Sequence, residues 1–70
     1  MKMSSFSEAN QVKLSLKMEL SQYAWFNSIL VLPESDGFGV VVFVDRIDDK
    51  IKKLIPQVRQ SVSVSIEKSK

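Results

Sequence analysis

The sequence predicts an α+β fold, a small two-layer sandwich in which two helices pack on one face of a three-stranded sheet in the order α-β-β-α-β. Three observations support this prediction. Apolar residues recur at helical spacing in the first third of the chain, an Asp-Gly pair joins two apolar runs in the middle, and valine alternates with serine near the end. Because the chain has 70 residues, we expect residues 1–70 to form a single α+β domain.

The first predicted element is a helix over residues 5–25. It starts at Ser5 and Glu8, whose Ser-x-x-Glu spacing is typical of a capping box. Apolar residues then follow at helical spacing along one side: Val12, Leu16, Leu20, Tyr23 and Ala24. Residues 13–20 also alternate between apolar and polar, so a half-buried strand is the alternative. We favour the helix because Leu, Met, Lys and Glu form helices readily and a cap precedes them.

The next two elements are predicted to be strands, residues 28–32 and 38–44, paired as an antiparallel hairpin. The connector between them ends in Asp36-Gly37, a pair that favours tight hairpin turns. We expect residues 38–44 to be the central strand of the sheet, because the hairpin pairs them on one side and a right-handed crossover places the last strand parallel to them on the other.

With Asp36 and Gly37 in the turn, the hairpin pairs Leu30 with Phe43 and Leu32 with Val41 on one face. Ile29 then meets Val44, and Val31 meets Val42, on the other face. Neither face carries a polar residue at these positions. Polarity therefore does not test this register.

The last two elements are a predicted short helix, residues 48–55, and a predicted strand, residues 61–66. The helix starts with Asp48 and Asp49, which suit a cap and a positive helix end, and Pro56 ends it. Its expected apolar side consists of Ile47, Ile51, Leu54 and Ile55. A right-handed crossover through this helix places the last strand parallel to the central one.

The composition excludes several kinds of catalytic and metal site. The chain has no His and no Cys, which removes imidazole bases, thiol nucleophiles and zinc sites built from nitrogen and sulfur ligands. The cluster of Asp45, Asp48 and Asp49 is explained by capping and solvation at a strand end and a helix start. We therefore expect no enzyme activity, no catalytic residue, no cofactor and no bound metal.

The same composition predicts the compartment. The absence of cysteine favours a reducing environment, because small secreted domains usually contain disulfides. No apolar run long enough for a signal sequence or a membrane span is present. We expect a soluble, cytoplasmic protein that does not enter a membrane.

The sheet suggests a function in protein interaction. If the helices cover the face bearing Ile29, Val31, Val40, Val42, Val44, Val62 and Val64, then four other apolar residues project from the opposite face: Leu30, Leu32, Val41 and Phe43. An exposed apolar patch of a few hundred Å² tends to mark an interface. We expect either a homodimer formed by packing of this face or docking on a larger protein. The alternative is that the N-terminal segment, or another register, covers the patch within one chain.

Nucleic-acid binding is the second hypothesis. The formal net charge is +2, and its excess lies in the second half of the chain, where four cations can contact phosphates: Lys50, Lys52, Lys53 and Arg59. Four aromatic residues can stack on bases: Tyr23, Trp25, Phe26 and Phe38. We favour a core role for the aromatic residues, because so small a chain needs its large apolar side chains inside.

Overall fold

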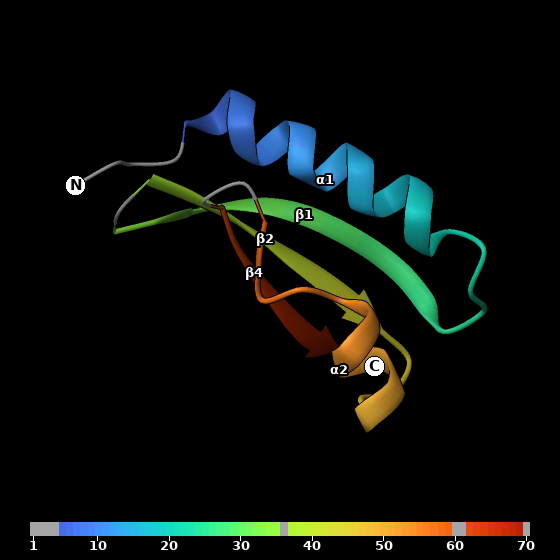
Figure 1. Cartoon of the computed structure of the whole chain (residues 1–70). Coiled ribbons are helices and arrows are strands. Elements are labelled where there is room, and N and C mark those ends of the chain that lie inside the picture. The colour runs from blue at the N-terminus through green and yellow to red at the C-terminus, as the bar shows by residue number, and fades with distance from the viewer. Residues whose placement is uncertain (1–4, 36, 60–61, 70) are drawn as a thin grey trace.

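Six elements follow one another along the chain in the computed structural model, which describes residues 5–35, 37–59 and 62–69. They are helix α1 (Phe6–Leu20), strands β1 (Phe26–Glu34) and β2 (Gly37–Val44), helix α2 (Asp49–Leu54), and strands β3 (Val58–Arg59) and β4 (Val62–Lys68). As Figure 1 shows, α1 runs along the sheet, whereas α2 is a short helix in the crossover from β2 to β4. The α+β prediction is confirmed.

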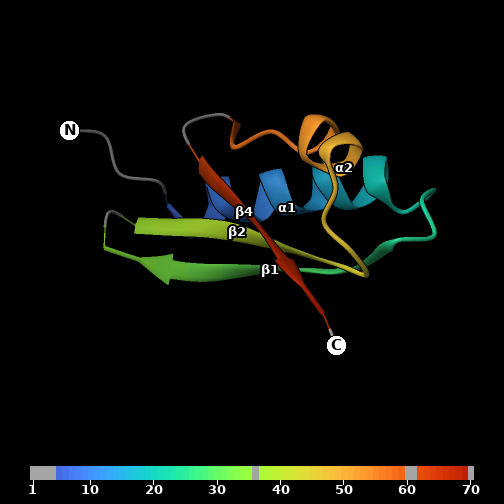
Figure 2. The same ribbon diagram turned by 90° about the horizontal axis from the view of Figure 1, so that it is seen from below.

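The sheet has four strands in the order β1-β2-β4-β3, so the predicted count of three is wrong. The hairpin β1–β2 is antiparallel, β4 is parallel to β2, and β3 is antiparallel to β4. The central place of residues 38–44 and the parallel last strand are confirmed. Figure 2 shows β4 strongly turned relative to β1 and β2, as strand twist requires. The sequence prediction missed β3 because two residues are too few to form a periodic pattern.

Helix α1 starts where the capping box predicts. The Glu8 N–H donates to Ser5 Oγ at 3.1 Å, and the Ser5 N–H donates to Glu8 Oε1 at 3.0 Å. The buried residues of α1 follow the helical period, which excludes the strand alternative: Ala9, Val12, Leu16 and Leu20.

The predicted end of this helix at residue 25 is wrong, because α1 ends at Leu20. Tyr23 and Trp25 lie beyond the helix, where their rings stack with centroids 4.8 Å apart. Both rings, together with Phe26, pack against the buried core. Their helical spacing thus reflects a turn that folds back onto the core. The predicted core role of these three aromatic residues is confirmed.

The register of the hairpin differs from the predicted one by two residues. Leu30 pairs with Val41, and Leu32 pairs with Gly39, up to a last pair between Glu34 and Gly37. Gly37 therefore belongs to the ladder and not to the turn, and Asp36 lies outside the described residues. A shift of two residues keeps every side chain on its face, since side chains alternate with a period of two.

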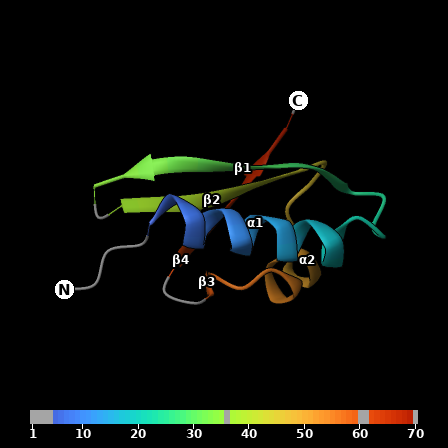
Figure 3. The ribbon, with the colours of Figure 1, turned by 90° about the horizontal axis from the view of Figure 1, so that it is seen from above.

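The core lies between α1 and the inner face of the sheet, by which we mean the face toward α1. The predicted layer of two helices is thus only partly right, because α2 is a short helix in the crossover. The sheet residues of the core are those that alternation predicts: Ile29, Val40, Val42, Val44, Val62 and Val64 are buried, and Val31 is partly buried. Figure 3 shows α1 lying along this face. From the crossover, Ile51 and Ile55 enter the same core, but Ile47 and Leu54 are exposed, contrary to the predicted apolar side.

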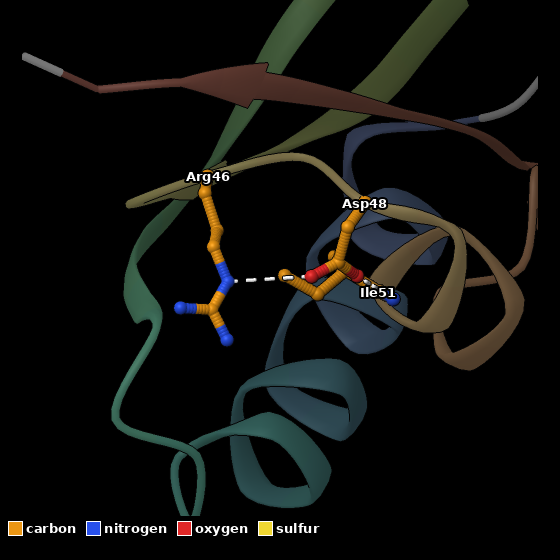
Figure 4. A network of polar contacts seen from close by, with 3 residues as sticks. All are labelled: Arg46, Asp48 and Ile51. Carbon is orange, nitrogen blue, oxygen red and sulfur yellow. Dashed lines mark hydrogen bonds and ion pairs between the residues drawn. The ribbon is translucent and has the colours of Figure 1, made fainter.

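The crossover helix α2 is held at its start by Asp48. Its carboxylate accepts a hydrogen bond from the Ile51 N–H at 2.9 Å and forms an ion pair with Arg46, whose Nε lies 3.3 Å away, as Figure 4 shows. The bond from Ile51 is the main cause that lowers the pKa of Asp48 below its ordinary value, and Arg46 adds to it. The predicted capping role of Asp48 is confirmed.

A cluster of hydrogen bonds at the C-terminal end of β2 connects this strand with the start of β1 and with the residue that follows β4. Asn27, at the irregular position between Phe26 and Ser28, donates through Nδ2 to Asp45 Oδ1 at 2.8 Å and to Ser69 Oγ. The Ser69 N–H and Oγ both donate to the Val44 carbonyl, at 2.8 and 3.1 Å. Each of these groups has a partner within the chain, so the cluster is structural.

Candidate protein-interaction face of the sheet

The face of the sheet turned away from α1, here called the outer face, carries all four residues that sequence analysis assigned to an interface. In Figure 2 the sheet lies in front of α1, and neither described helix lies over β1 or β2. Strand alternation places all four on this side, where Leu30 pairs with Val41, Leu32 pairs with Gly39, and Phe43 pairs with Ser28. Among the residues that the structure describes, no helix covers this face.

These four residues differ in how much they expose. Leu30 is 47% exposed and Leu32 is 40% exposed, whereas Phe43 is half-buried and Val41 is only 7% exposed. Val41 is buried because it pairs with Leu30 on one side and with Ser65 on the other, in the middle of the sheet. The two leucines on the edge strand β1 therefore carry the larger share of the exposed apolar surface.

The short strand β3 adds one residue to the outer face that sequence analysis missed. Val58 pairs with Ser63, and directly paired residues share a face, so Val58 lies on the same side as the serines of β4. Its side chain is 63% exposed. Val58 is thus a separate exposed apolar residue at the edge of the outer face, with Ser63 and Ser65 of β4 between it and Val41.

Acidic residues border the outer face at both ends. At the hairpin end, the Glu34 carboxylate lies over Gly39, within 3 Å of where a Cβ atom would stand. At the other end, Glu67 pairs with Phe43. Gly39 is thus explained by the close approach of the Glu34 side chain.

The cations of the nucleic-acid hypothesis do not form one surface. Lys50, Lys52 and Lys53 are exposed on α2. Arg59 instead pairs with Val62, an inner-face residue, and its guanidinium forms an ion pair of 2.8 Å with Glu19 of α1. The three lysines of α2 therefore do not share a surface with Arg59.

The aromatic residues of that hypothesis also have partners within the chain. Phe38 meets Phe6 edge to face, with ring centroids 5.5 Å apart, and Tyr23 stacks on Trp25. Phe38 also packs against the buried core. Tyr23 and Trp25 thus each use one ring face for the other, and both also pack against the buried core.

Two further features are absent from residues 5–35, 37–59 and 62–69. In these ranges no three Asp or Glu side chains gather in a way that could hold a metal ion. No helix in the same ranges has the length and apolar character needed to cross a membrane.

Comparisons with protein-family models, with curated proteins and with solved structures found no significant match. The outer face is therefore interpreted from its own geometry, burial and charge.

Proposed function

We propose that this protein is a small, non-enzymatic interaction domain that self-associates through the outer face of its sheet. One observation supports the proposal above all others. Leu30 and Leu32 are each at least 40% exposed on a sheet face that also carries the half-buried Phe43 and that no described helix covers. Removing these side chains from water favours association.

The size of the face predicts how strong the association is. Three strands span about 14 Å and seven residues span about 23 Å, which gives a face of roughly 330 Å² before side-chain relief is counted. Stable dimers usually bury about 800 Å² on each partner. We therefore expect a weak, concentration-dependent dimer with a dissociation constant of about 10 µM or higher.

The occupant that fits this face best is a second copy of the same sheet. Two sheets pack face to face about 10 Å apart, with their side chains interdigitating. A two-fold axis through the centre of the face would bring Leu30, Leu32 and Phe43 of both copies together. On the part of the outer face formed by β4, the side chains are serines, which are small enough to let the two sheets approach each other.

Sedimentation equilibrium over a series of concentrations tests this proposal. The wild-type protein is expected to move from the monomer mass toward twice that mass as concentration rises. Leu30→Glu is expected to raise the dissociation constant at least about ten-fold, because it removes an apolar contact and places an unpaired carboxylate in the interface.

The matched control is Leu14→Glu, since Leu14 is 50% exposed but lies on α1, away from the outer face. This variant is expected to associate as the wild type does. A wild-type protein that stays monomeric at millimolar concentration contradicts the proposal. Equal weakening by the two variants contradicts it as well, because it would place the contact elsewhere.

Nucleic-acid binding by the lysines of α2 is the second candidate, and it is supported by their exposure on a single helix turn. It predicts retention on a DNA or RNA column at low salt that weakens steeply as salt rises. The Lys50→Gln, Lys53→Gln double variant would then elute earlier. Failure to bind at low salt excludes this candidate and leaves the outer face as the interaction site.

A further inference from the structure

A groove of about 470 Å³ lies at the opposite edge of the sheet, away from Leu30 and Leu32. Its lining comes from the end of α2, the segment that leads into β3, and the middle of β4: Lys52, Ile55, Pro56, Gln57, Val64, Ser65 and Ile66. Four of these seven residues are apolar, and Lys52 is the one charged residue among them. A groove of this volume is large enough for a few side chains of a ligand.

The groove lies beside the edge of β4, whose second half has no partner strand on this side among the described residues. Strand β3 pairs only with Val62 and Ser63 of β4, and the next bond on this side runs from the Val64 N–H to the Gln57 carbonyl at 2.7 Å. On the other side, Ser69 donates to β2. Along β4 the backbone N–H and C=O groups of successive residues point alternately to the β2 side and to the β3 side. The N–H and C=O groups of Ile66 and Lys68 therefore point toward the open edge.

The charged side chain in the groove lining is a lysine, and Glu67, the acidic residue of the open edge, lies on the outer face with Phe43. Lys52 lies in the groove lining, Lys53 is next to it on α2, and Lys68 lies on the open edge. Within the described ranges, the ion pairs join Arg46 to Asp48 and Arg59 to Glu19, and neither involves these lysines. No acidic residue lines the groove, so a negatively charged group is the complementary ligand.

We propose that this groove and the open edge of β4 bind an extended peptide segment that carries a carboxylate. The segment adds as a strand beside Ile66–Lys68, and its backbone bonds with the groups that β3 leaves unpaired. Alternate side chains enter the groove against Ile55, Pro56 and Val64, and the carboxylate among them meets the Lys52 ammonium. The groove shares Ser65 with the outer face, but the strand addition uses backbone groups on the edge of β4, so it does not depend on the proposed self-association.

Titrations monitored by two-dimensional NMR of the ¹⁵N-labelled chain test the site. The probe is a blocked pentapeptide, valine-threonine-glutamate-threonine-valine, whose valines and glutamate share one side of a strand. We expect saturable shifts of the amide signals of Ile66, Glu67 and Lys68. The amide signal of Gln57, which is part of the groove lining, is expected to shift as well. A second peptide with glutamine in place of glutamate is expected to bind about three-fold more weakly.

Three comparisons make the test specific. Lys52→Gln should remove the preference for glutamate over glutamine, whereas the control Lys53→Gln, one residue along the same helix but outside the groove lining, should keep it. Methylation of the peptide nitrogens that face β4 should abolish binding, because strand addition requires those donors.

The outcomes that overturn the proposal are equally distinct. They are the absence of saturable shifts with the glutamate peptide up to about 5 mM, equal binding of the methylated peptide, or a glutamate preference that survives Lys52→Gln. Each can occur whether or not the protein dimerises through its outer face. Failure of peptide binding therefore does not contradict the proposed self-association. Failure of self-association likewise does not contradict the proposed peptide site.

Discussion

Gly37 and Gly39 lie two positions apart in β2, yet the backbone requires glycine only at the first. Gly37 has a φ of 127°, a conformation that side chains rarely adopt, and it closes the hairpin opposite Glu34. Gly39 instead leaves room above the strand for the Glu34 carboxylate, which is the far end of a flexible side chain. Substitution to alanine is therefore strained at Gly37, whereas at Gly39 the Glu34 side chain can move aside.

Asp48 is the residue whose ionisation is most clearly linked to folding. Its pKa is lowered from the ordinary value of 3.8, mainly by the hydrogen bond from Ile51 and also by Arg46. Because the folded state holds the carboxylate at the lower pKa, its stabilising contribution is complete above about pH 4. That contribution is lost as the pH falls through the folded-state pKa.

We predict that Asp48→Asn loses less stability than the wild type when the pH is lowered from about 7 to about 3, because asparagine keeps a capping oxygen but does not ionise. Urea unfolding at a series of pH values measures this. The control is Asp49→Asn, which removes the neighbouring carboxylate and leaves the cap intact; it should lose stability in acid as the wild type does. Equal acid losses for Asp48→Asn and the wild type contradict this account.

At the scale of elements, the start of α1 depends on the reciprocal bonds between Ser5 and Glu8. We predict that Ser5→Ala lowers the free energy of unfolding by about 0.5–2 kcal/mol, because the Glu8 backbone amide loses its acceptor, the Ser5 hydroxyl. The control is Ser15→Ala, at an exposed position inside the same helix, which should be neutral or slightly stabilising. Thermal or urea unfolding of the three proteins measures the difference, and an unchanged Ser5→Ala protein would show that the cap adds nothing.

The elements show which features of a sequence predict structure and which do not. Helix starts were predicted because caps are local and chemically specific, as at Ser5 and Asp48. The end of α1 was not, because Tyr23 and Trp25 keep helical spacing while they fold back onto the core. The hairpin register escaped prediction since a two-residue shift preserves both faces, and polarity distinguishes only one-residue shifts.

At the scale of the whole molecule, alternation correctly separated the inner face from the outer face. It did not predict that Val41 is buried on the outer face, because that depends on the pairing of Leu30, Val41 and Ser65 across three strands. It also could not place Val58 on this face, because β3 is defined only by its pairing with β4. The groove beside β4 likewise depends on where β3 stops, which no pattern in the sequence indicates.

The two proposed sites occupy separate parts of the molecule. The outer face presents apolar side chains between two acidic ends, whereas the open edge of β4 presents backbone groups beside lysines. One suits a second copy of the same sheet, and the other suits an acidic extended segment. A dimer through the outer face would leave both copies of the β4 edge accessible.

The central claim is that the outer face loses water on self-association, and methyl-resolved NMR through a dilution series tests it most directly. Between about 1 mM and about 20 µM, the methyl signals of Leu30, Leu32 and Val41 are expected to shift with concentration. The methyl signals of Leu14 and Met18, which are exposed on α1, are expected to stay fixed. Shifts confined to Leu14 and Met18, or no dependence on concentration at any of these five residues, would contradict the account.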